Sequence, residues 1–371
     1  MGKLKIGILG DGQLAKYLVH AGEKLSLEIM ALGLNPDECI AKSNHCTGDI
    51  FNANDVVKFA KSVDILTLEN EFIPLDILEL VADKLLPSFE SFKLIENKLA
   101  EKKLAKKLSI AQVPYELISI DELNYSGSAF YKLAKGGYDG KGNFLVESFA
   151  DFHKMYSWLE QSPYSSIIKE DILNFEKEVS ITLVRNKKGQ IVTYPIVDTI
   201  QKNHVCEFVS VPALIGNTIK DKVIQYSKKL LEAIDYIGVM SIEYFITQDG
   251  KVLYNECSPR PHNSAHYTMD ACYTSQFENH IRSLIGEDLG LTDLKYPCAS
   301  MFNLLGTQKG LNRLASITLA NNESFLYDYG KREERPGRKM GHINLVGQDK
   351  TSLINFAKQY KEQLKSLGFT K

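Results

Sequence analysis

Apolar residues in the first ninety positions alternate between short strand-like runs and one helical stripe. The runs Lys5–Leu9, Glu28–Leu32 and Ile65–Leu68 are typical of buried strands. After a glycine turn at 10–12, the residues that share one helical face are apolar: Leu14, Leu18, Ala21 and Leu25. Strands that alternate with helices form parallel sheets. The sequence therefore predicts an α/β unit at the N-terminus.

The rest of the chain predicts longer helices and antiparallel strands. Residues 91–108 form one basic amphipathic helix in this prediction, with Leu94, Leu104 and Leu108 inside and its lysines mostly in solvent. Further helices are predicted near 150–160, 217–235, 269–285 and 350–365. Strands are predicted within 115–175, over 177–185 and 190–197, and as short pieces after 297. The later part of the chain is therefore α+β.

A hairpin over 241–260 brings two carboxylates together. Asp249-Gly250 favours a two-residue type I′ turn, which pairs Gln248 with Lys251 and, five steps further, Glu243 with Glu256. The same register puts Tyr244, Ile246, Leu253 and Asn255 on the other face. Opposed carboxylates repel each other, and a hard cation such as Mg²⁺ would relieve the repulsion. The alternative is a polar, solvent-exposed sheet face.

The segment GGYDGKG at 136–142 predicts a phosphate-binding flap. Its four glycines allow backbone N–H groups to approach an anion closely, and Lys132 and Lys141 add positive charge. The Gly-Lys-Ser/Thr of a P-loop is absent. A flexible hairpin tip is the alternative. Downstream, the apolar run that enters Glu170–Leu173 could bind adenine and a later glutamate a ribose, although an exposed acidic turn would look the same.

Composition narrows the function classes. The net charge is −2, which gives no reason to expect a nucleic-acid partner or an anionic membrane surface, and no apolar run is long enough to span a membrane. The six cysteines lack Cys-x-x-Cys spacing, so we expect reduced thiols in a cytoplasmic protein and no zinc. Gly10-x-Gly12-x-x-Ala15 only loosely matches a dinucleotide fingerprint, and no acidic residue ends the second strand. We expect no NAD, whereas an anion at this helix N-terminus remains possible.

The order of these parts resembles the ATP-grasp ligases, and in particular the 5-(carboxyamino)imidazole ribonucleotide synthase family of purine biosynthesis. The segments that carry the resemblance are GDGQLAKYL at 10–18, GGYDGKG at 136–142, GVMSIEYF at 238–245, YNECSPRPHNSAHYT at 254–268 and RPGRKMGHIN at 335–344. It implies a Rossmann-like pre-ATP-grasp domain over 1–100, a lid subdomain over 101–180, a metal and nucleotide subdomain over 181–296 and a small C-terminal domain over 297–371. It also implies a homodimer.

The resemblance assigns roles by position. Lys98 and Lys132 would bind the nucleotide phosphates, and Glu243 and Glu256 the Mg²⁺, or Mn²⁺, of the ATP complex. The other implied ATP-binding residues are Gly137, Tyr138, Asp139, Gly140, Lys141, Gly142, Asn143, Glu170, Asp171, Ile172, Leu173, Glu178, Asn255 and Glu256. The ribonucleotide and carboxyphosphate region would be lined by Arg260, His262, Asn263, Lys331, Arg335 and Arg338, of which Arg260, Lys331 and Arg338 would be catalytic.

The implied reaction is an ATP- and bicarbonate-dependent carboxylation of 5-aminoimidazole ribonucleotide through carboxyphosphate. Two alternatives stay open: a formate-dependent glycinamide ribonucleotide transformylase of the same superfamily, and a non-catalytic nucleotide-binding protein of the same fold. Asn263-Ser264-Ala265-His266 departs from the transformylase pattern, and the paired carboxylates argue against a module that only binds nucleotide. One departure from the synthase pattern is Gln201, which stands where the family usually has a histidine.

Overall fold

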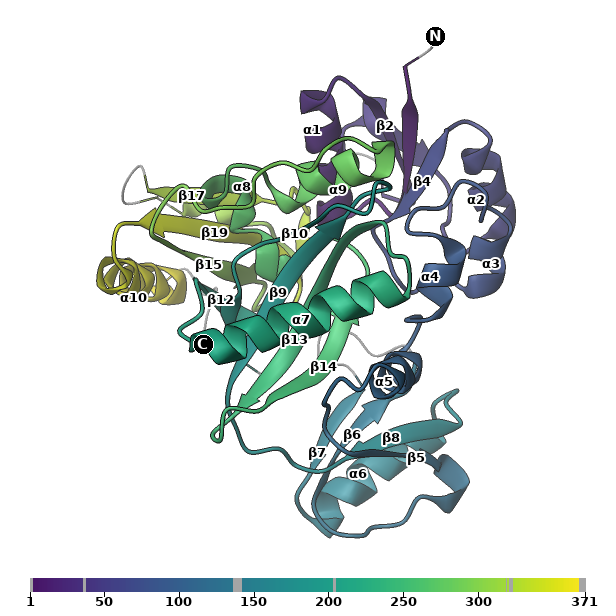
Figure 1. Cartoon of the computed structure of the whole chain (residues 1–371), viewed down its shortest axis with the longest axis vertical. Coiled ribbons are helices and arrows are strands. Elements are labelled where there is room, and N and C mark those ends of the chain that lie inside the picture. Colours follow the sequence, from purple (N-terminus) through teal and green to yellow (C-terminus); the bar gives the residue numbers. More distant parts are fainter. Residues whose placement is uncertain are drawn as a thin grey trace.

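The chain folds into a parallel N-terminal sheet, a small four-stranded lid and a large antiparallel sheet, as the computed structural model in Figure 1 shows. The structure describes residues 3–35, 38–135, 142–202, 205–317, 319 and 323–366. The α/β prediction with α+β later domains is confirmed. Within these described ranges, no helix combines the length and the apolar composition that a membrane span requires.

The N-terminal domain is a parallel sheet in the order β3-β2-β1-β4. Its elements are β1 (Lys5–Leu9), α1 (Gln13–Lys24), β2 (Glu28–Gly33), β3 (His45–Thr47), α2 (Ala53–Ala60), β4 (Ile65–Leu68) and α3 (Leu75–Glu79). Leu14, Leu18 and Ala21 of α1 are buried against β1 and β2, as their spacing predicts. The carboxyl ends of β1 and β4 face the rest of the molecule, where residues 10–14 and 69–72 lie.

The single helix predicted over 91–108 is wrong. Two shorter helices form instead, α4 (Phe89–Lys93) and α5 (Lys98–Lys107). The Asn97 side chain accepts a hydrogen bond from Ala100 N at 2.9 Å and starts α5 there, because an N-terminal cap satisfies a backbone donor that lacks a helical partner. The break leaves Leu94 46% exposed, although the prediction placed it inside.

The lid is an antiparallel sheet in the order β5-β8-β6-β7, covered by one helix, and it extends from the body of the molecule (Figure 1). Its elements are β5 (Tyr115–Ser119), β6 (Ala129–Leu133), β7 (Asn143–Val146), α6 (Phe149–Glu160) and β8 (Ser166–Glu170). Tyr131, Leu133, Phe152 and Ile167 form its small core. Residues 136–141 of the predicted flap, between β6 and β7, lie outside the described residues.

The large sheet has the strand order β14-β13-β9-β11-β12-β15-β19-β17, with β10 beside β9. Its strands are β9 (Phe175–Arg185), β10 (Ile191–Thr193), β11 (Val197–Lys202), β12 (Val205–Val211), β13 (Gly238–Thr247), β14 (Val252–Ser258), β15 (Cys298–Leu305), β17 (Ser324–Asp328) and β19 (Lys339–Gly347). A small pair, β16 (Gly310–Leu311) and β18 (Glu333–Glu334), lies apart from it. The predicted short strands after 297 include two long ones, because β15 and β19 continue this sheet through the pairing of β12 with β15.

Helices cover this sheet. They are α7 (Asn217–Ala233), α8 (Thr268–Ala271), α9 (Gln276–Ile285) and α10 (Lys350–Ser366). Helix α7 runs across β9 and β13 (Figure 1) and buries Val223, Leu230 and Leu231 against them. The helix predicted over 269–285 is α8 and α9, separated where the Ser275 side chain caps α9. The core behind β13 and β14 therefore holds the hairpin rigidly in place.

Candidate active site

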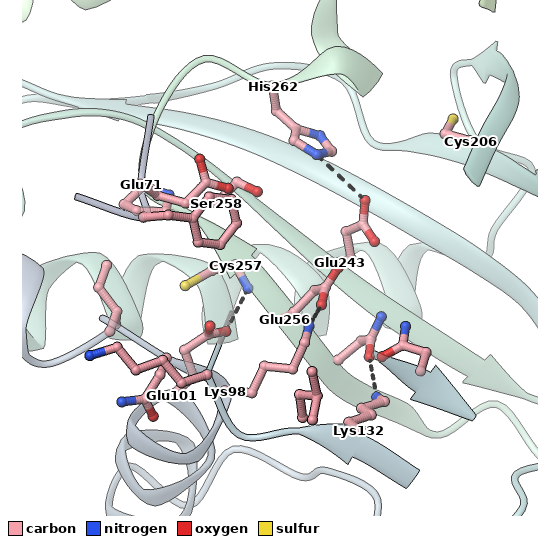
Figure 2. A pocket seen from close by; sticks show the side chains of 18 of the residues that line it. Glu71, Lys98, Glu101, Lys132, Cys206, Glu243, Glu256, Cys257, Ser258 and His262 are labelled. Atoms are coloured by element: carbon pink, nitrogen blue, oxygen red, sulfur yellow. Dashed lines mark hydrogen bonds and ion pairs between the residues drawn. The ribbon is translucent and has the colours of Figure 1, made fainter. Parts of the chain in front are cut away.

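One cavity of about 900 Å³ lies where the three parts of the fold meet. The N-terminal domain contributes Gln13 and residues 69–72, the lid contributes Lys132 and residues 170–173, and the large sheet contributes Glu243, Glu256 and residues 258–263. Figure 2 shows the charged side chains of these three parts converging on the same space. The cavity therefore collects most of the predicted site residues from segments far apart in the sequence.

The hairpin of β13 and β14 pairs Glu243 with Glu256 as predicted, but through a different register at its turn. The predicted two-residue turn is wrong: Thr247 N donates to Lys251 O at 3.0 Å, so residues 248–250 form a three-residue connection with Gly250 at φ +77°. The connection shifts the pairing by one residue, so that Tyr244 opposes Tyr254. A β-bulge at Asn255 then shifts it back, because a bulge opposes two residues to one.

The bulge and the three-residue connection also change which residues of β14 face the core, so the predicted faces of this strand are wrong. Val252 and Tyr254, in place of Leu253 and Asn255, pack in the core with Tyr244 and Ile246. Asn255 lines the cavity beside Glu256, and its Oδ1 accepts a hydrogen bond from Lys132 Nζ at 3.0 Å. The bulge thus delivers an amide oxygen and a carboxylate from consecutive residues to one site.

Glu243 and Glu256 differ in electrostatic environment. Lys98 forms an ion pair with Glu256, and its positive charge lowers the pKa of Glu256. Glu243 has His262 Nε2 at 4.0 Å, and burial together with the charges of Glu256 and Glu178 raises its pKa. A cation bound beside Glu243 would therefore favour the ionised form of this carboxyl group.

The predicted nucleotide residues of the lid lie on the same cavity. Lys132 Nζ is 2.9 Å from Glu170 Oε2, and Asp171, Ile172 and Leu173 continue the wall after Glu170. Gly142, at φ +82°, begins the return strand and Asn143 lines the cavity, whereas Gly137, Tyr138, Asp139, Gly140 and Lys141 lie outside the described residues. Glu178 lines the opposite wall together with Gln201, which hydrogen-bonds to it.

Arg260 and its neighbours line the end of the cavity that faces the N-terminal domain. Arg260 binds the carboxylate of Glu71 through two nitrogens, with Nη2 to Oε1 at 2.6 Å. His262 Nδ1 is 2.9 Å from Ser264 Oγ, which fixes the ring beside Glu243. Asn263 is buried, and its Nδ2 donates to Asn303 Oδ1 at 2.7 Å. All three predicted residues therefore line the cavity, as the resemblance implies.

The N-terminus of α1 carries an internal anion. Glu69 accepts hydrogen bonds from Gly12 N at 3.0 Å and Leu14 N at 3.3 Å. A Cβ at Gly12 would lie 2.4 Å from Glu69 Oε1, so the glycine makes room for this carboxylate. The possible anion site at this helix is thus filled by a side chain of the protein itself.

The predicted C-terminal residues lie outside the lining of this cavity. Lys331 Nζ donates to Lys339 O at 2.8 Å, Arg338 Nη2 contacts both Glu38 carboxylate oxygens at 3.1 Å, and Arg335 is exposed. Lys339, which the sequence did not single out, lines the cavity instead. Burial lowers the pKa of Lys331, whereas the charges of Glu69 and Glu38 raise it. Lys331 is therefore close to Glu69 at the N-terminus of α1 and to Glu38, the ion-pair partner of Arg338.

Sequence reasoning missed several charged residues at the site: Glu69, Glu71, Glu101, Lys102 and Lys339. Glu101 lines the cavity and accepts hydrogen bonds from Tyr254 Oη at 2.6 Å and Cys257 N at 2.8 Å. Lys102, predicted to lie in solvent, is 2% exposed and pairs with Glu170. The spacing of Lys98, Glu101 and Lys102 on one helical face was the available signal, but it is equally typical of a solvated face.

We predict that Glu178 and Glu101 contribute stability to the nucleotide-free protein that is lost as the pH rises from about 4.5 to 7. Burial and the charge of Glu256 raise the pKa of Glu178 from 4.5 to about 7, and burial raises that of Glu101 to about 7. At these two groups the folded state therefore binds more protons than the unfolded state in this window, whereas His266, His280 and His342, whose pKa values burial lowers, act in the opposite direction. Urea unfolding at several pH values measures the slope of the unfolding free energy against pH.

Glu178→Gln is expected to make the slope of the unfolding free energy against pH more positive than in the wild type, whereas Glu176→Gln, an exposed position on the same strand, is expected to leave it unchanged. Equal slopes in the wild type and Glu178→Gln would show that Glu178 ionises as it does in the unfolded chain.

Known families match the chain along most of its length. Residues 3–95 match a ribonucleotide synthetase preATP-grasp domain, residues 103–277 an ATP-grasp domain, and residues 299–355 a phosphoribosylaminoimidazole carboxylase C-terminal domain. An N5-carboxyaminoimidazole ribonucleotide synthase from Bacillus subtilis is 34% identical over 361 residues, which cover 94% of this chain and 93% of that protein.

Two further similarities agree with this match. A phosphoribosylaminoimidazole carboxylase of Candida albicans is 35% identical over 364 residues, which cover 92% of this chain but only 63% of that longer protein. The crystal structure of N5-carboxyaminoimidazole synthase from Aspergillus clavatus in complex with ADP and 5-aminoimidazole ribonucleotide has a TM-score of 0.87 and 25% identity, and covers 98% of this chain and 99% of that one. The chain belongs to the N5-carboxyaminoimidazole ribonucleotide synthase family of ATP-grasp ligases.

Proposed function

We propose that the protein carboxylates 5-aminoimidazole ribonucleotide with ATP and bicarbonate, and forms 5-(carboxyamino)imidazole ribonucleotide, ADP and phosphate. The observation that carries the proposal is the single cavity in which Glu243, Asn255 and Glu256 face Lys132 on one side and Arg260 and His262 on the other. The relatives named as synthases, and the related structure with ADP and the aminoimidazole ribonucleotide, support it.

The carboxylates fit a magnesium ion delivered with ATP. No group of three His, Cys, Asp or Glu side chains that could hold a metal is found among the described residues. Mg²⁺ is commonly held by one or two carboxylates together with phosphate oxygens and water, so two glutamates and the Asn255 oxygen suffice. Burial and the charges of Glu256 and Glu178 raise the pKa of Glu243, and a cation bound there would favour its ionised form. Mg²⁺, or Mn²⁺, would neutralise phosphate charge there.

The chain's own residues account for the transfer step. A bicarbonate oxygen attacks the γ-phosphorus of ATP, and ADP leaves. Lys132, held by Glu170 and Asn255, places its ammonium group where the phosphate charge develops. Lys98 supplies a second positive charge beside Glu256. Residues 136–142 would close over the triphosphate and keep water from the labile carboxyphosphate.

The second step joins the carboxyl carbon to the exocyclic amine of the ribonucleotide, and phosphate leaves. Arg260, His262 and Asn263 line the cavity end next to the N-terminal domain, where this substrate would lie. Lys331, Arg335 and Arg338 lie beyond the present lining, and we propose that they bind its 5′-phosphate, since arginine is a favoured partner of phosphate. Arg338 would exchange Glu38 for the phosphate.

The deciding experiment measures ADP release by the purified protein with each carbon donor and each acceptor. ADP formation that needs bicarbonate, and that 5-aminoimidazole ribonucleotide accelerates, supports the proposal. Formate in place of bicarbonate, with glycinamide ribonucleotide as acceptor, would instead identify the transformylase. Nucleotide binding without turnover under any condition would identify a binding protein.

We further propose that the enzyme is a cytoplasmic homodimer with the four domains given above. Light scattering would test the dimer, and limited proteolysis would test the domain boundaries.

Arg338→Ala is expected to raise the KM for the aminoimidazole ribonucleotide about tenfold or more, because a charged hydrogen bond is worth about 1.5–3 kcal/mol. The KM for ATP should change little, since Arg338 does not line the ATP-side cavity. Steady-state kinetics with each substrate varied in turn gives both constants. A loss confined to ATP would contradict the assignment, and Arg332→Ala, an exposed neighbour, is the control.

A further inference from the structure

A buried cluster of three charged side chains lies behind the phosphate end of the cavity. Lys102 of α5, Glu170 at the end of β8 and Lys132 of β6 have exposures of 2%, 4% and 5%. Glu170 lies between the two lysines: its Oε1 forms an ion pair with Lys102, and its Oε2 is 2.9 Å from Lys132 Nζ. One carboxylate therefore serves two ammonium groups.

Lys102 does not reach the cavity itself. Glu170 and Lys132 line it, whereas Lys102, a described residue, does not. Lys102 Nζ lies 5.1 Å from the centre of the Tyr115 ring, and the Lys102 carbonyl accepts a hydrogen bond from Gln112 Nε2 at 2.8 Å. These contacts fix Lys102 on the far side of Glu170, so any effect on a ligand passes through that carboxylate.

The charge balance of the cluster is unequal. Burial would raise the pKa of Glu170, but the charges of Lys132 and Lys102 outweigh it and lower that pKa. A pair of Glu170 and Lys132 alone would be neutral, and its attraction for an anion would be weak. When both lysines are protonated, the second lysine leaves the buried cluster with a net charge of one positive unit, while burial lowers the pKa of Lys102. Lys132 Nζ carries this charge toward Asn255 and the cavity.

We propose that Lys102 is a positioning residue for the triphosphate: it shares the charge of Glu170, so that Lys132 keeps positive charge for the ATP phosphates. The inference rests on the proposed function only in taking ATP as the ligand. Neither Lys102 nor its carboxylate partner needs to take part in the carboxylation. Binding of nucleotides in the absence of the other substrates therefore tests the inference separately from the reaction.

The first test compares ATP and AMP binding by calorimetry in Lys102→Met. The loss of one positive charge next to the phosphates should weaken ATP binding about tenfold and AMP binding less than about twofold, since AMP lacks the outer phosphates. Lys102→Arg should retain most of the ATP affinity. Lys103→Met, at an exposed position one residue away on α5, should leave both nucleotides unaffected. Unchanged ATP binding, or an equal loss for ATP and AMP, would overturn the proposal.

The second test uses charge compensation. Lys102→Met combined with Glu170→Gln returns the cluster to one net positive charge, so the double variant should recover part of the ATP affinity that Lys102→Met loses. If Lys102 only filled space, the losses of ATP affinity caused by the two substitutions would add. ATP binding weaker in the double variant than in Lys102→Met would therefore refute the proposal. If Lys102→Met fails to fold, Lys102→Gln, whose amide can still donate to the Glu170 carboxylate, takes its place in both tests.

Discussion

Replacement of Glu256 by glutamine is expected to abolish ADP formation while the protein stays folded. The amide keeps the shape of the side chain but removes the negative charge that Lys98 and, in the proposed function, the ATP-bound metal share. Transfer of the γ-phosphoryl group depends on that charge neutralisation, so turnover should fall below detection. Coupled-enzyme detection of ADP at saturating ATP measures the effect.

The structure also sets the direction of the stability change. Two opposed glutamates by themselves would predict that the nucleotide-free variant gains stability. Lys98 reverses this expectation, because Glu256→Gln leaves its partly buried ammonium group without its ion-pair partner. We expect a lower Tm without nucleotide. Glu176→Gln on β9, which is exposed, should change neither activity nor Tm. Turnover near the wild-type rate in Glu256→Gln at low Mg²⁺ would remove Glu256 from the metal site.

Lys132→Met is expected to lower kcat by about 100-fold or more, the size of effect seen when one preorganised donor to a developing charge is removed. The fold should survive, because Glu170 retains its ion pair with Lys102. Single-turnover measurement of ADP formation isolates the transfer step from product release.

Lys169→Met is the matched control for Lys132→Met. Lys169 precedes Glu170 on β8, but its Nζ donates to Ser126 Oγ at 2.7 Å on the other face of the lid, so kcat should be unchanged. An equal loss of activity in both variants would mean that lid stability, and not the position of the Lys132 charge, limits the reaction.

The contact between Glu243 and Glu256 was predicted correctly from a turn that was predicted wrongly. The Asp249-Gly250 signal predicts a two-residue turn, but Thr247 and Lys251 close a three-residue connection, and the bulge at Asn255 cancels the shift. Alternation of side chains follows from local strand geometry, so the sequence predicted correctly that Tyr244 and Ile246 face the core. The bulge depends on how β14 packs in the sheet, so the sequence alone did not predict it.

Helix α5 shows the opposite case. Its lysine-rich sequence fits a solvated face, and Lys103 and Lys106 are exposed as predicted. Lys98 and Lys102 are turned inward because Glu256 and Glu170 arrive there from distant strands. Whether such a lysine is buried or solvated depends on its partner. The partner of Lys98 is 158 residues away in the sequence, and helical periodicity carries no information about so distant a residue.

The sequence by itself determined the βαβ start of the N-terminal domain, the family, and many of the residues that line the cavity, because apolar periodicity and short motifs are local properties of the chain. Only the tertiary structure decided which charges meet. It brought Glu69 onto the N-terminus of α1, Glu71 onto Arg260 and Lys102 behind Glu170, and it left Lys331 and Arg338 outside the cavity lining. Ion pairs between separate domains depend on the packing of whole sheets and helices, and burial then fixes the strength of each pair.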